Sequence, residues 1–445
     1  MCDNCGATYQ KWQGKCDVCG KFNTLIEQTP EEKTFAKNIV AKSSGRKLDF
    51  AKIADVSEDL VSQRISTGID DLDLVLGGGI MVGGVVLVAG QPGIGKSTLL
   101  MQISALISRN KNVLYVSGEE NAAQVKSRAQ RLLGADFAKS VNLNLASSTS
   151  ADDVAETIAS GEFNLVVVDS MQTMAMADIS SAPGTVSQIT NSSNVIIRAA
   201  KNSNTAVLLV GHVTKDGAIA GPKVMEHLVD VVLTFEGDRY GGFKMVRAVK
   251  NRYGSTAEVA IFDMTNEGLK IVENPSAALL AERSDTDGSV VLATMEGNRP
   301  LLVEIQALVN ATSFGYAKRA ASGFDQNRLG LLVAVLERRT KLKLADKDIF
   351  INVVGGLKLD DRAADLAVCM AIASAAAERK IGDGAVVFGE VGLGGEIRSA
   401  RAANRRIDEA KKLGFKFALT PKNSGGGNFA KPASDLRDAL NQYLK

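Results

Sequence analysis

No apolar run in this sequence is long enough to cross a membrane. The longest, residues 80–89, covers about half of the roughly 20 residues that a transmembrane helix needs, and it contains two glycines. The apolar core of a signal peptide is also missing near the N-terminal methionine. We therefore expect neither membrane insertion nor export, and the cytoplasm is the expected location.

An excess of charge of one sign is missing too, because 52 lysines and arginines face 50 aspartates and glutamates. This balance excludes no anionic partner, since a polyanion needs a local basic patch rather than a global excess. With 45% hydrophobic and 23% charged residues, the composition excludes wholesale disorder and collagen-like or coiled-coil architectures. The 445 residues exceed the ~250–300 at which one core stops growing, so we expect two or three folding units.

Cysteine is scarce outside the N-terminus, where four of the five cysteines lie. Cys2 and Cys5 form one Cys-x2-Cys pair, Cys16 and Cys19 form another, and a glycine follows each pair. Four thiolates in this pattern are typical ligands of tetrahedral zinc, and so short a segment needs a metal to fold. A redox pair or disulfides are the alternative, which the expected cytosolic setting disfavours. We interpret Cys369, in an alanine-rich helical stretch, as a buried small apolar residue.

The remaining sequence divides into a linker and two larger domains. After a zinc finger over residues 1–27, residues 28–49 are charged and rich in serine and lysine, as linkers are. Over 50–272, short β-branched runs alternate with helical periodicity, which predicts an α/β domain with a parallel sheet. A Pro-Ser break lies in 273–282, and over 283–445 strands of alternating polarity followed by further helices and strands predict an α+β domain.

A glycine-rich loop carries the first chemical signal. It matches the G-x4-G-K-[ST] pattern of a P-loop, and it lies between a predicted strand and a predicted helix, which is the context that this motif requires. In a P-loop, backbone amides wrap the triphosphate, the lysine neutralises the β and γ oxygens, and the following hydroxyl binds Mg²⁺. We expect ATP to bind at Gly90, Gln91, Pro92, Gly93, Ile94, Gly95, Lys96, Ser97 and Thr98, with Lys96 catalytic and Ser97 on magnesium.

Polar residues follow three more predicted strands. Asp169 ends an apolar strand at the position expected to hold the Mg²⁺ shell, with strand capping as the alternative. Glu119 and Glu120 end another strand, at the carboxyl edge where the site of an open α/β sheet lies. We choose Glu119 as the base for the attacking water and keep Glu120 as the alternative. His212 ends a third strand and is interpreted as a γ-phosphate sensor, or else as a structural histidine.

Several motifs together resemble the bacterial RadA (Sms) family of DNA-repair proteins. They are a four-cysteine finger with Trp12 and Gly14, Tyr-Val-Ser-Gly-Glu-Glu at 115–120, Val-Asp-Ser-Met-Gln-Thr at 168–173, Gly-His-Val-Thr-Lys-Asp-Gly at 211–217, and Lys-Asn-Arg-Tyr-Gly at 250–254. The resemblance covers essentially the whole chain. The last motif usually reads Lys-Asn-Arg-Phe-Gly, so Tyr253 is a conservative departure that leaves the assignment intact.

The resemblance implies a RecA-like ATPase core and a C-terminal domain similar to that of Lon protease. It also implies a DNA-dependent ATP-driven motor that uses ATP, Mg²⁺ and Zn²⁺ and helps RecA-made recombination intermediates extend by branch migration. Its implied partners are single-stranded and branched DNA, the RecA recombinase and further copies of the chain in a hexameric ring. No membrane partner is implied.

Roles of single residues also come from the resemblance. Glu119 matches the catalytic glutamate of RecA-like and DnaB-type motors. Lys250 and Arg252 resemble the pair that DnaB-type hexamers project into a neighbouring subunit's nucleotide, and such a guanidinium stabilises charge on the transferring phosphoryl group. The implied trans-acting motif, with Arg252 catalytic, comprises Lys250, Asn251, Arg252, Tyr253 and Gly254. A basic turn on a solvated face is the alternative.

DNA contacts are expected in two loops, residues 174–194 and 214–223, because the corresponding loops of RecA-like proteins face a central channel. Ordinary surface loops remain the alternative, since small polar residues and a lysine carry little specificity. In the C-terminal domain, basic pairs either contact DNA or cover solvated helix faces. These pairs are Lys318-Arg319, Arg338-Arg339 and Arg405-Arg406.

The Lon-like domain lacks the residues of a Ser/Lys peptidase. Where the Lon pattern has its nucleophilic serine this chain has Ala364, with no serine from 362 to 370, and Arg398 stands where the lysine is expected. Arginine cannot act as a base because its pKa stays above ~12. We therefore expect a scaffold. The competing functions are an ATP-dependent protease or its regulator, and a clock-like or recombinase-like ATPase that does not translocate.

Overall fold

The computed structural model describes Cys2 and residues 14–22, 52, 63–212, 223–237, 242–312, 315–382 and 384–444. The chain divides into two compact units, Met1–Glu58 and Asp59–Lys445. The predicted linker 28–49 lies outside the described residues. Among the described residues, no helix combines the length and the apolar character needed to span a bilayer.

In the first unit, a tight turn presents two cysteines. The amide of Gly20 donates to the carbonyl of Cys16 at 2.8 Å, and the amide of Cys16 donates to Lys21 at 2.9 Å. A bridge between Lys15 and Phe22 closes the turn. This geometry places Cys16 and Cys19 on one loop, as a Cys-x2-Cys metal knuckle requires.

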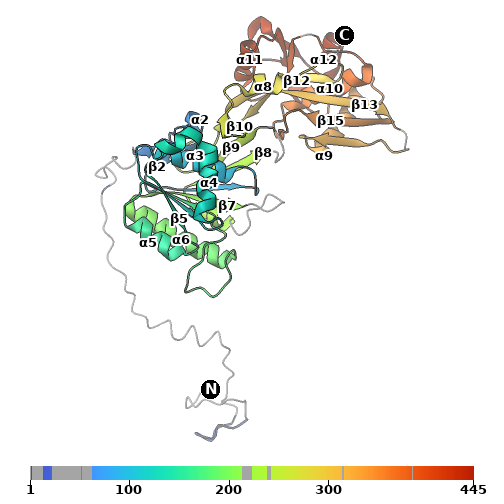
Figure 1. Ribbon diagram of the computed structural model, residues 1–445. Helices are drawn as coiled ribbons and strands as arrows, with labels where there is room; N and C mark the ends of the chain where they lie inside the picture. The colour runs from blue at the N-terminus through green and yellow to red at the C-terminus, as the bar shows by residue number, and fades with distance from the viewer. Residues whose placement is uncertain are drawn as a thin grey trace. The chain divides into compact units, whose positions relative to one another are not determined.

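The larger unit is built first around a nine-stranded sheet (Figure 1). Six strands, from β8 to β5 in the spatial order, run parallel, and β9, β10 and β11 extend the sheet in antiparallel fashion. The spatial order is β11 (Gly268–Ile271), β10 (Val259–Thr265), β9 (Lys244–Asn251), β8 (Val231–Gly237), β3 (Val85–Gly90), β7 (Ala206–His212), β6 (Leu165–Asp169), β4 (Val113–Ser117) and β5 (Leu143–Ser147).

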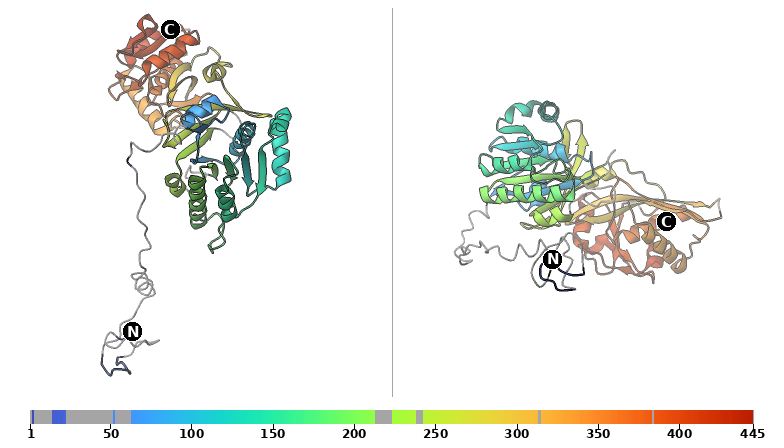
Figure 2. Two further views of the ribbon diagram at one scale, coloured as in Figure 1. Left: turned by 90° about the vertical axis from the view of Figure 1, so that its left-hand side faces the viewer. Right: turned by 90° about the horizontal axis from the view of Figure 1, so that it is seen from below.

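Helices cover both faces of this sheet, which is why its central strands are continuous apolar runs rather than alternating ones. The helices α3 (Lys96–Ile107) and α4 (Ala122–Leu133) pack on one face together with α2 (Asp70–Leu76). On the other face pack α5 (Ala151–Ala159), α6 (Val186–Ser203) and α7 (Lys223–Leu228). Figures 1 and 2 show α5 and α6 side by side on that face. The short strands β1 (Arg64–Ile65) and β2 (Ile80–Met81) pair separately.

The predicted DNA loop at residues 174–194 is partly wrong. The helix α6 begins at Val186, with Thr185 as its N-cap, so the second half of this segment is helical. Its buried positions, including Gln188, Ile189, Ser192 and Ser193, recur at helical spacing. Polar side chains occupy three of the eight buried positions, which hid the amphipathic pattern in the sequence. Residues 213–222, almost all of the second expected loop, lie outside the described residues.

The C-terminal α+β region contains a seven-stranded mixed sheet. Its strands lie in the order β14 (Arg319–Ser322), β15 (Lys347–Val353), β13 (Arg299–Ala311), β12 (Ser289–Glu296), β16 (Ala385–Val387), β19 (Phe417–Pro421) and β20 (Ala430–Ala433). Helices α8 (Pro275–Leu280), α9 (Gln326–Arg339), α10 (Ala364–Ala377), α11 (Ala403–Lys412) and α12 (Leu436–Tyr443) complete it, with a small hairpin of β17 (Glu390–Val391) and β18 (Ile397–Arg398).

Three details of this region test the sequence analysis. The predicted alternation of polarity fails in β12, which is buried at almost every position because helices pack on it and on β13. Cys369 is fully buried in α10, and burial raises the pKa of its thiol well above the ordinary value, which confirms that it is a core residue. Arg406 is also fully buried and pairs with Asp361 at 2.7 Å, so its expected exposure to DNA is wrong.

Candidate nucleotide site

The loop between β3 and α3 has the backbone of a phosphate cradle. Gly95, directly before α3, has φ of +118°, and a Cβ there would lie 2.7 Å from the terminal methyl carbon of Met264. The positive φ favours glycine at this position, whereas the flexible methionine side chain can shift to make room for a Cβ. A Cβ on Gly93 would meet nothing within 4 Å, so the loop is open on that side. The amides at the start of the twelve-residue helix α3 have no intrahelical partner and suit an anion.

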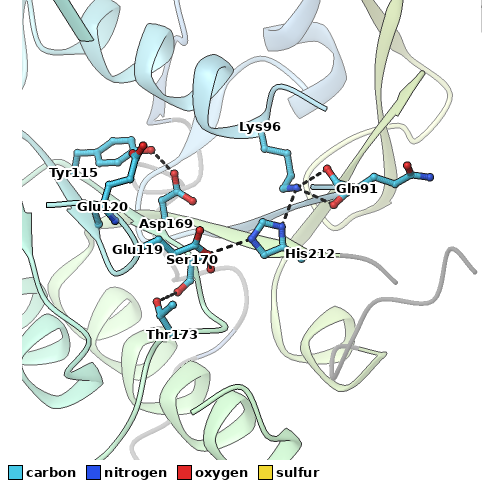
Figure 3. Close-up of polar contacts among 11 residues, drawn as sticks. Gln91, Lys96, Tyr115, Glu119, Glu120, Asp169, Ser170, Thr173 and His212 are labelled. Atoms are coloured by element: carbon cyan, nitrogen blue, oxygen red, sulfur yellow. Dashed lines mark hydrogen bonds and ion pairs between the residues drawn. The ribbon is translucent and has the colours of Figure 1, made fainter. Parts of the chain in front are cut away.

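Lys96 begins α3 and turns its side chain back to this loop (Figure 3). Its Nζ donates to the carbonyls of Gly90 at 2.8 Å and Gln91 at 3.0 Å. Burial lowers the pKa of Lys96 to about 8, an effect that the negative charges of Asp169 and Glu119 partly oppose. The ammonium is thus held close to the loop that a phosphate would occupy.

His212, at the end of β7, connects the lysine to Glu119. Lys96 Nζ lies 3.2 Å from His212 Nδ1, and His212 Nε2 lies 3.4 Å from Glu119 Oε1. Because an ammonium only donates, Nδ1 is assigned as the acceptor, which leaves the proton on Nε2 facing the carboxylate. Ser170 donates its hydroxyl to the same Glu119 oxygen at 2.6 Å.

The two neighbouring glutamates have different surroundings. Burial alone would raise the pKa of Glu119, but hydrogen bonds from Ser170 and His212 outweigh it and lower that pKa below its ordinary value. Glu120 instead pairs with Arg128 of α4 at 2.9 Å. Glu119 therefore faces the loop residues, whereas Glu120 is engaged by a helix.

Asp169 ends β6 and is 8% exposed. Its Oδ2 accepts a hydrogen bond from the hydroxyl of Tyr115 at 2.5 Å. Burial and then the charge of Asp169 raise the pKa of Tyr115 well above its ordinary value, so the phenol keeps its proton. We call Lys96, Glu119, Asp169 and His212 the strand-end cluster. Asp169 and His212 end parallel strands, Glu119 lies two residues after the end of β4, and Lys96 faces them from the start of α3.

The motif at 250–254 lies at the end of β9. Lys250 Nζ donates to the carbonyls of Glu226, His227 and Val229 at 2.6, 3.2 and 2.7 Å, which caps the C-terminus of α7. Arg252 pairs with buried Asp230 at 3.2 Å, yet its side chain stays 53% exposed. The motif is thus anchored within the chain and leaves one guanidinium accessible.

Contacts with Val75 and Gly77, at the end of α2, hold the rest of this motif in place. Asn251 donates to the carbonyl of Val75 at 3.2 Å and accepts from the amide of Tyr253 at 2.8 Å. A Cβ on Gly254 would lie 2.8 Å from the Cα of Gly77, so this close approach of two backbones requires glycine. The sequence alone did not reveal these structural duties.

Three of the four predicted zinc ligands come together in the first unit. The thiols of Cys2, Cys16 and Cys19 lie within 4.8 Å of one another, and the sulfurs of Cys2 and Cys19 are 3.8 Å apart. Tetrahedral zinc with bonds of about 2.3 Å places its sulfurs about 3.8 Å apart, whereas a disulfide needs about 2.05 Å. Cys5 lies outside the described residues. The arrangement fits zinc, and these three cysteines are not disulfide-bonded.

Sequence reasoning missed two residues that contact the strand-end cluster, Tyr115 and Ser170, and also Arg128, which contacts Tyr115 and Glu120. The available signals were a tyrosine within an aliphatic strand and a serine directly after Asp169. At the Lon-like positions, Ala364 begins α10 and is buried, and Arg398 is exposed and paired with Glu396 at 2.5 Å. Neither position offers a nucleophile or a base.

Comparisons with known proteins agree with this layout. Residues 1–27 match a rubredoxin metal binding domain, residues 52–218 an AAA domain, and residues 328–424 the subunit ChlI of Mg-chelatase. The DNA repair protein RadA of Listeria monocytogenes is 45% identical, with 96% of this chain and 92% of that protein aligned. The RadA of Halalkalibacterium halodurans is 44% identical over 100% of this chain and 98% of that protein.

The chain belongs to the RadA family of DNA repair proteins. The RadA of Escherichia coli is a third such relative, 43% identical over 95% of this chain and 92% of that protein. As a RadA-family protein, the chain has a RecA-like α/β core, an N-terminal zinc ribbon and a ChlI- or Lon-like C-terminal domain. Its cofactors are ATP, Mg²⁺ and Zn²⁺.

Proposed function

We propose that this protein is a DNA-dependent ATPase that works as a motor in recombinational repair and stimulates branch migration of RecA-mediated strand exchange. Family membership supports the repair role. The observation that carries the ATPase proposal is the strand-end cluster, in which a lysine, two carboxylates and a histidine meet at one edge of a parallel sheet. This edge is where open α/β sheets bind their ligands.

In this proposal, residues 90–98 bind the triphosphate and Mg²⁺ supplies charge neutralisation when bound. Lys96 carries a positive charge to the β and γ oxygens, and its lowered pKa leaves it charged at neutral pH. Ser97 and Asp169 would hold the metal. The amides of the loop and of the first turn of α3 add donors that need no reorganisation.

Glu119 is the proposed base. Its carboxylate remains ionised at neutral pH, because its pKa lies below the ordinary value, and it can accept a proton from a water near Oε1. Ser170 and His212 fix its orientation. His212 contacts both Lys96 and Glu119, which suits a sensor of the γ-phosphate. The Arg128 pair makes Glu120 the weaker candidate.

Arg252 is proposed to complete the site of a neighbouring subunit in a ring, which we take to be hexameric. Its exposed side chain supports this role, and the contacts of Lys250 and Asn251 hold the turn in place. A guanidinium that arrives in trans couples hydrolysis to subunit contact. Tyr253 and Gly254 complete the proposed trans-acting motif.

The proposed DNA partners are single-stranded and branched DNA, and RecA is the proposed protein partner. The proposed domains are a finger over 1–27, a linker over 28–49, an ATPase domain over 50–272 and a non-proteolytic Lon-like domain over 283–445. The exposed pair Arg338-Arg339 remains a candidate DNA contact. The alternative of an ATP-dependent protease finds no support at Ala364 or Arg398.

Hydrolysis of ATP by the full chain, measured with and without single-stranded DNA, tests the proposal. We expect stimulation by DNA, and faster extension of RecA strand-exchange intermediates when this protein and ATP are added. A rate of hydrolysis that does not change when DNA is added would instead favour an ATPase that does not translocate.

A mixing experiment tests Arg252. We expect Arg252→Ala to bind ATP and form rings but to fail in hydrolysis-coupled movement. Mixed with Lys96→Ala, it should show some ATP hydrolysis that neither pure variant has, because one interface then pairs an intact P-loop with an intact arginine. Mixtures that stay inactive at all ratios, despite demonstrated subunit exchange, would remove the trans role.

A further inference from the structure

A tyrosine hydroxyl lies directly behind the carboxylate proposed to hold magnesium. Tyr115 is fully buried in β4, and β4 is paired in parallel with β6, so that Ser117 lies opposite Asp169. Tyr115 is therefore the diagonal neighbour of Asp169, a spacing that a long aromatic side chain can bridge. Its hydroxyl reaches Asp169 Oδ2 at 2.5 Å (Figure 3).

The hydroxyl has a second neighbour on α4. Arg128 Nη2 lies 3.4 Å from the tyrosine oxygen and 2.9 Å from Glu120 Oε2. Glu120 also anchors its own backbone, since its amide donates to the Ser117 hydroxyl at 3.0 Å. A row of four polar groups thus runs from the partly exposed Glu120 through Arg128 and Tyr115 to buried Asp169.

This row of polar groups contacts only one of the two carboxylate oxygens of Asp169. Oδ2 is taken by Tyr115, whereas no hydrogen bond to Oδ1 forms among the residues that the structure describes. A carboxylate held by one oxygen has a defined orientation, and an oriented ligand binds a hard cation more tightly than a rotating one. Tyr115 itself is too buried to contact nucleotide.

We infer that Tyr115 is a positioning residue, which holds Asp169 so that its second carboxylate oxygen faces the magnesium-binding edge. Arg128, tied to Glu120, keeps the hydroxyl in place. This inference rests on the proposed ATPase function and deepens it. It also separates the two adjacent glutamates, since Glu119 faces the chemistry and Glu120 supports the residue behind it.

The decisive variant is Tyr115→Phe in the full-length protein, because phenylalanine keeps the packing of β4 and removes only the hydroxyl. We measure the rate of ATP hydrolysis against Mg²⁺ concentration and, independently of turnover, the affinity for a non-hydrolysable ATP analogue at the same Mg²⁺ concentrations, which should fall in the variant only at low Mg²⁺. The Mg²⁺ concentration for half-maximal rate should rise about tenfold, as the loss of one hydrogen bond to a charged group would give. At saturating Mg²⁺ the rate should approach that of the wild type.

Arg128→Gln is the second variant, for the case that Tyr115→Phe does not fold. It keeps the hydroxyl but loosens its support, so the Mg²⁺ requirement should rise in the same direction and by less. Tyr443→Phe is the matched control, since it removes a tyrosine hydroxyl from α12 in the C-terminal region. The control should have the wild-type Mg²⁺ dependence.

The outcomes are distinguishable. An unchanged Mg²⁺ requirement in folded Tyr115→Phe, or a rate lowered equally at every Mg²⁺ concentration, overturns the positioning role and leaves the proposed ATPase intact. If Tyr115→Phe does not fold, an unchanged requirement in Arg128→Gln overturns it equally. Absence of hydrolysis by the wild type at any Mg²⁺ and DNA concentration would instead sink the proposed function.

Discussion

The strand-end cluster and the start of α10 both place charged side chains beside buried strands, but they differ in what those charges contact. In the strand-end cluster, the side chain of Glu119 is still 48% exposed although it accepts two hydrogen bonds. At α10, Asp365 is 1% exposed and is bonded to Arg328 and to the amide of Val391. The charge of Glu119 thus stays accessible, whereas that of Asp365 is neutralised within the fold.

The same contrast extends to the arginines. Arg252 keeps about half of its side chain exposed while it pairs with Asp230. Arg406 is fully buried, pairs with Asp361 and donates to the carbonyls of Ala293 and Arg401. A charged residue at a position that resembles a known active site is therefore not evidence of a catalytic site until its hydrogen-bond and ion-pair partners are known. Arg252 keeps an accessible charge that suits its proposed role, whereas the charge of Arg406 is neutralised within the fold and supports its architecture.

The largest effect that this comparison predicts is the loss of hydrolysis in Lys96→Ala. The change removes the cation that faces the phosphate loop, and we expect a fall of at least about 1,000-fold in the rate, in the range that charged phosphoryl-transfer groups supply. Thermal unfolding should change little, because the desolvation of the buried ammonium offsets its hydrogen bonds to the carbonyls of Gly90 and Gln91. The rate is measured with a phosphate-release assay.

Two matched substitutions sharpen this prediction. Glu119→Gln should bind ATP and hydrolyse it slowly, whereas Glu120→Gln should have the smaller effect. A larger effect of Glu120→Gln would mean that the base was chosen wrongly. Normal turnover by Lys96→Ala would refute the P-loop assignment altogether.

The next largest effect concerns the ion pair of Asp365 and Arg328, whose charges are neutralised within the fold. Asp365→Ala should destabilise the protein by up to about 3–5 kcal/mol, because it leaves the Arg328 guanidinium, which is only 15% exposed, without its carboxylate partner. Denaturant unfolding measures this change. Glu267→Ala, which breaks the exposed pair with Lys270, is the control and should leave the unfolding midpoint unchanged.

A double variant checks the physical cause. Arg328→Met combined with Asp365→Leu removes both charges and should recover much of the lost stability, because a buried pair gains little over apolar packing. A double variant no more stable than Asp365→Ala would show that packing, and not the unpaired charge, causes the loss.

Much of the strand-end cluster could be predicted because its signals are local. The P-loop spacing, Asp169 at the end of an apolar strand and Glu119 at the end of another can each be read from consecutive residues. Parallel strands bring such ends to one edge, so the cluster follows from the fold class. Tyr115 could not be assigned, because its contact with Asp169 depends on β4 being the neighbour of β6.

The failures have the same origin in long-range contacts. Arg406 looked like a surface residue beside Arg405, and only its pairing with Asp361, far away in the sequence, explains its burial. The burial of β12 on both faces depends on which helices pack there. Lys250 caps the C-terminus of α7, and nothing in the sequence indicates that the two are neighbours.

The last and smallest predicted effect concerns a buried carboxyl whose charge is only partly neutralised by its ion-pair partner. Glu296 is 6% exposed, and its nearest cation, Arg247, lies 3.5 Å away and is shared with Glu236 at 2.6 Å. Burial raises the pKa of Glu296 to about 7, with Arg247 opposing the rise and Glu236 adding to it. The folded protein therefore holds a proton on this carboxyl that the unfolded chain releases near its ordinary pKa of 4.5.

Because the folded pKa is the higher one, the neutral carboxyl stabilises the protein fully below about pH 4.5, and this contribution is lost as the pH rises through about 7. Glu296→Gln stays neutral at every pH. We expect the unfolding free energy of the wild type to fall relative to that of this variant, by up to about 3 kcal/mol between pH 5 and 8. Denaturant unfolding at several pH values measures the difference. Parallel curves for the two proteins would show that Arg247 compensates the charge of Glu296 as completely as Arg328 compensates that of Asp365, and the distinction between full and partial neutralisation would then disappear.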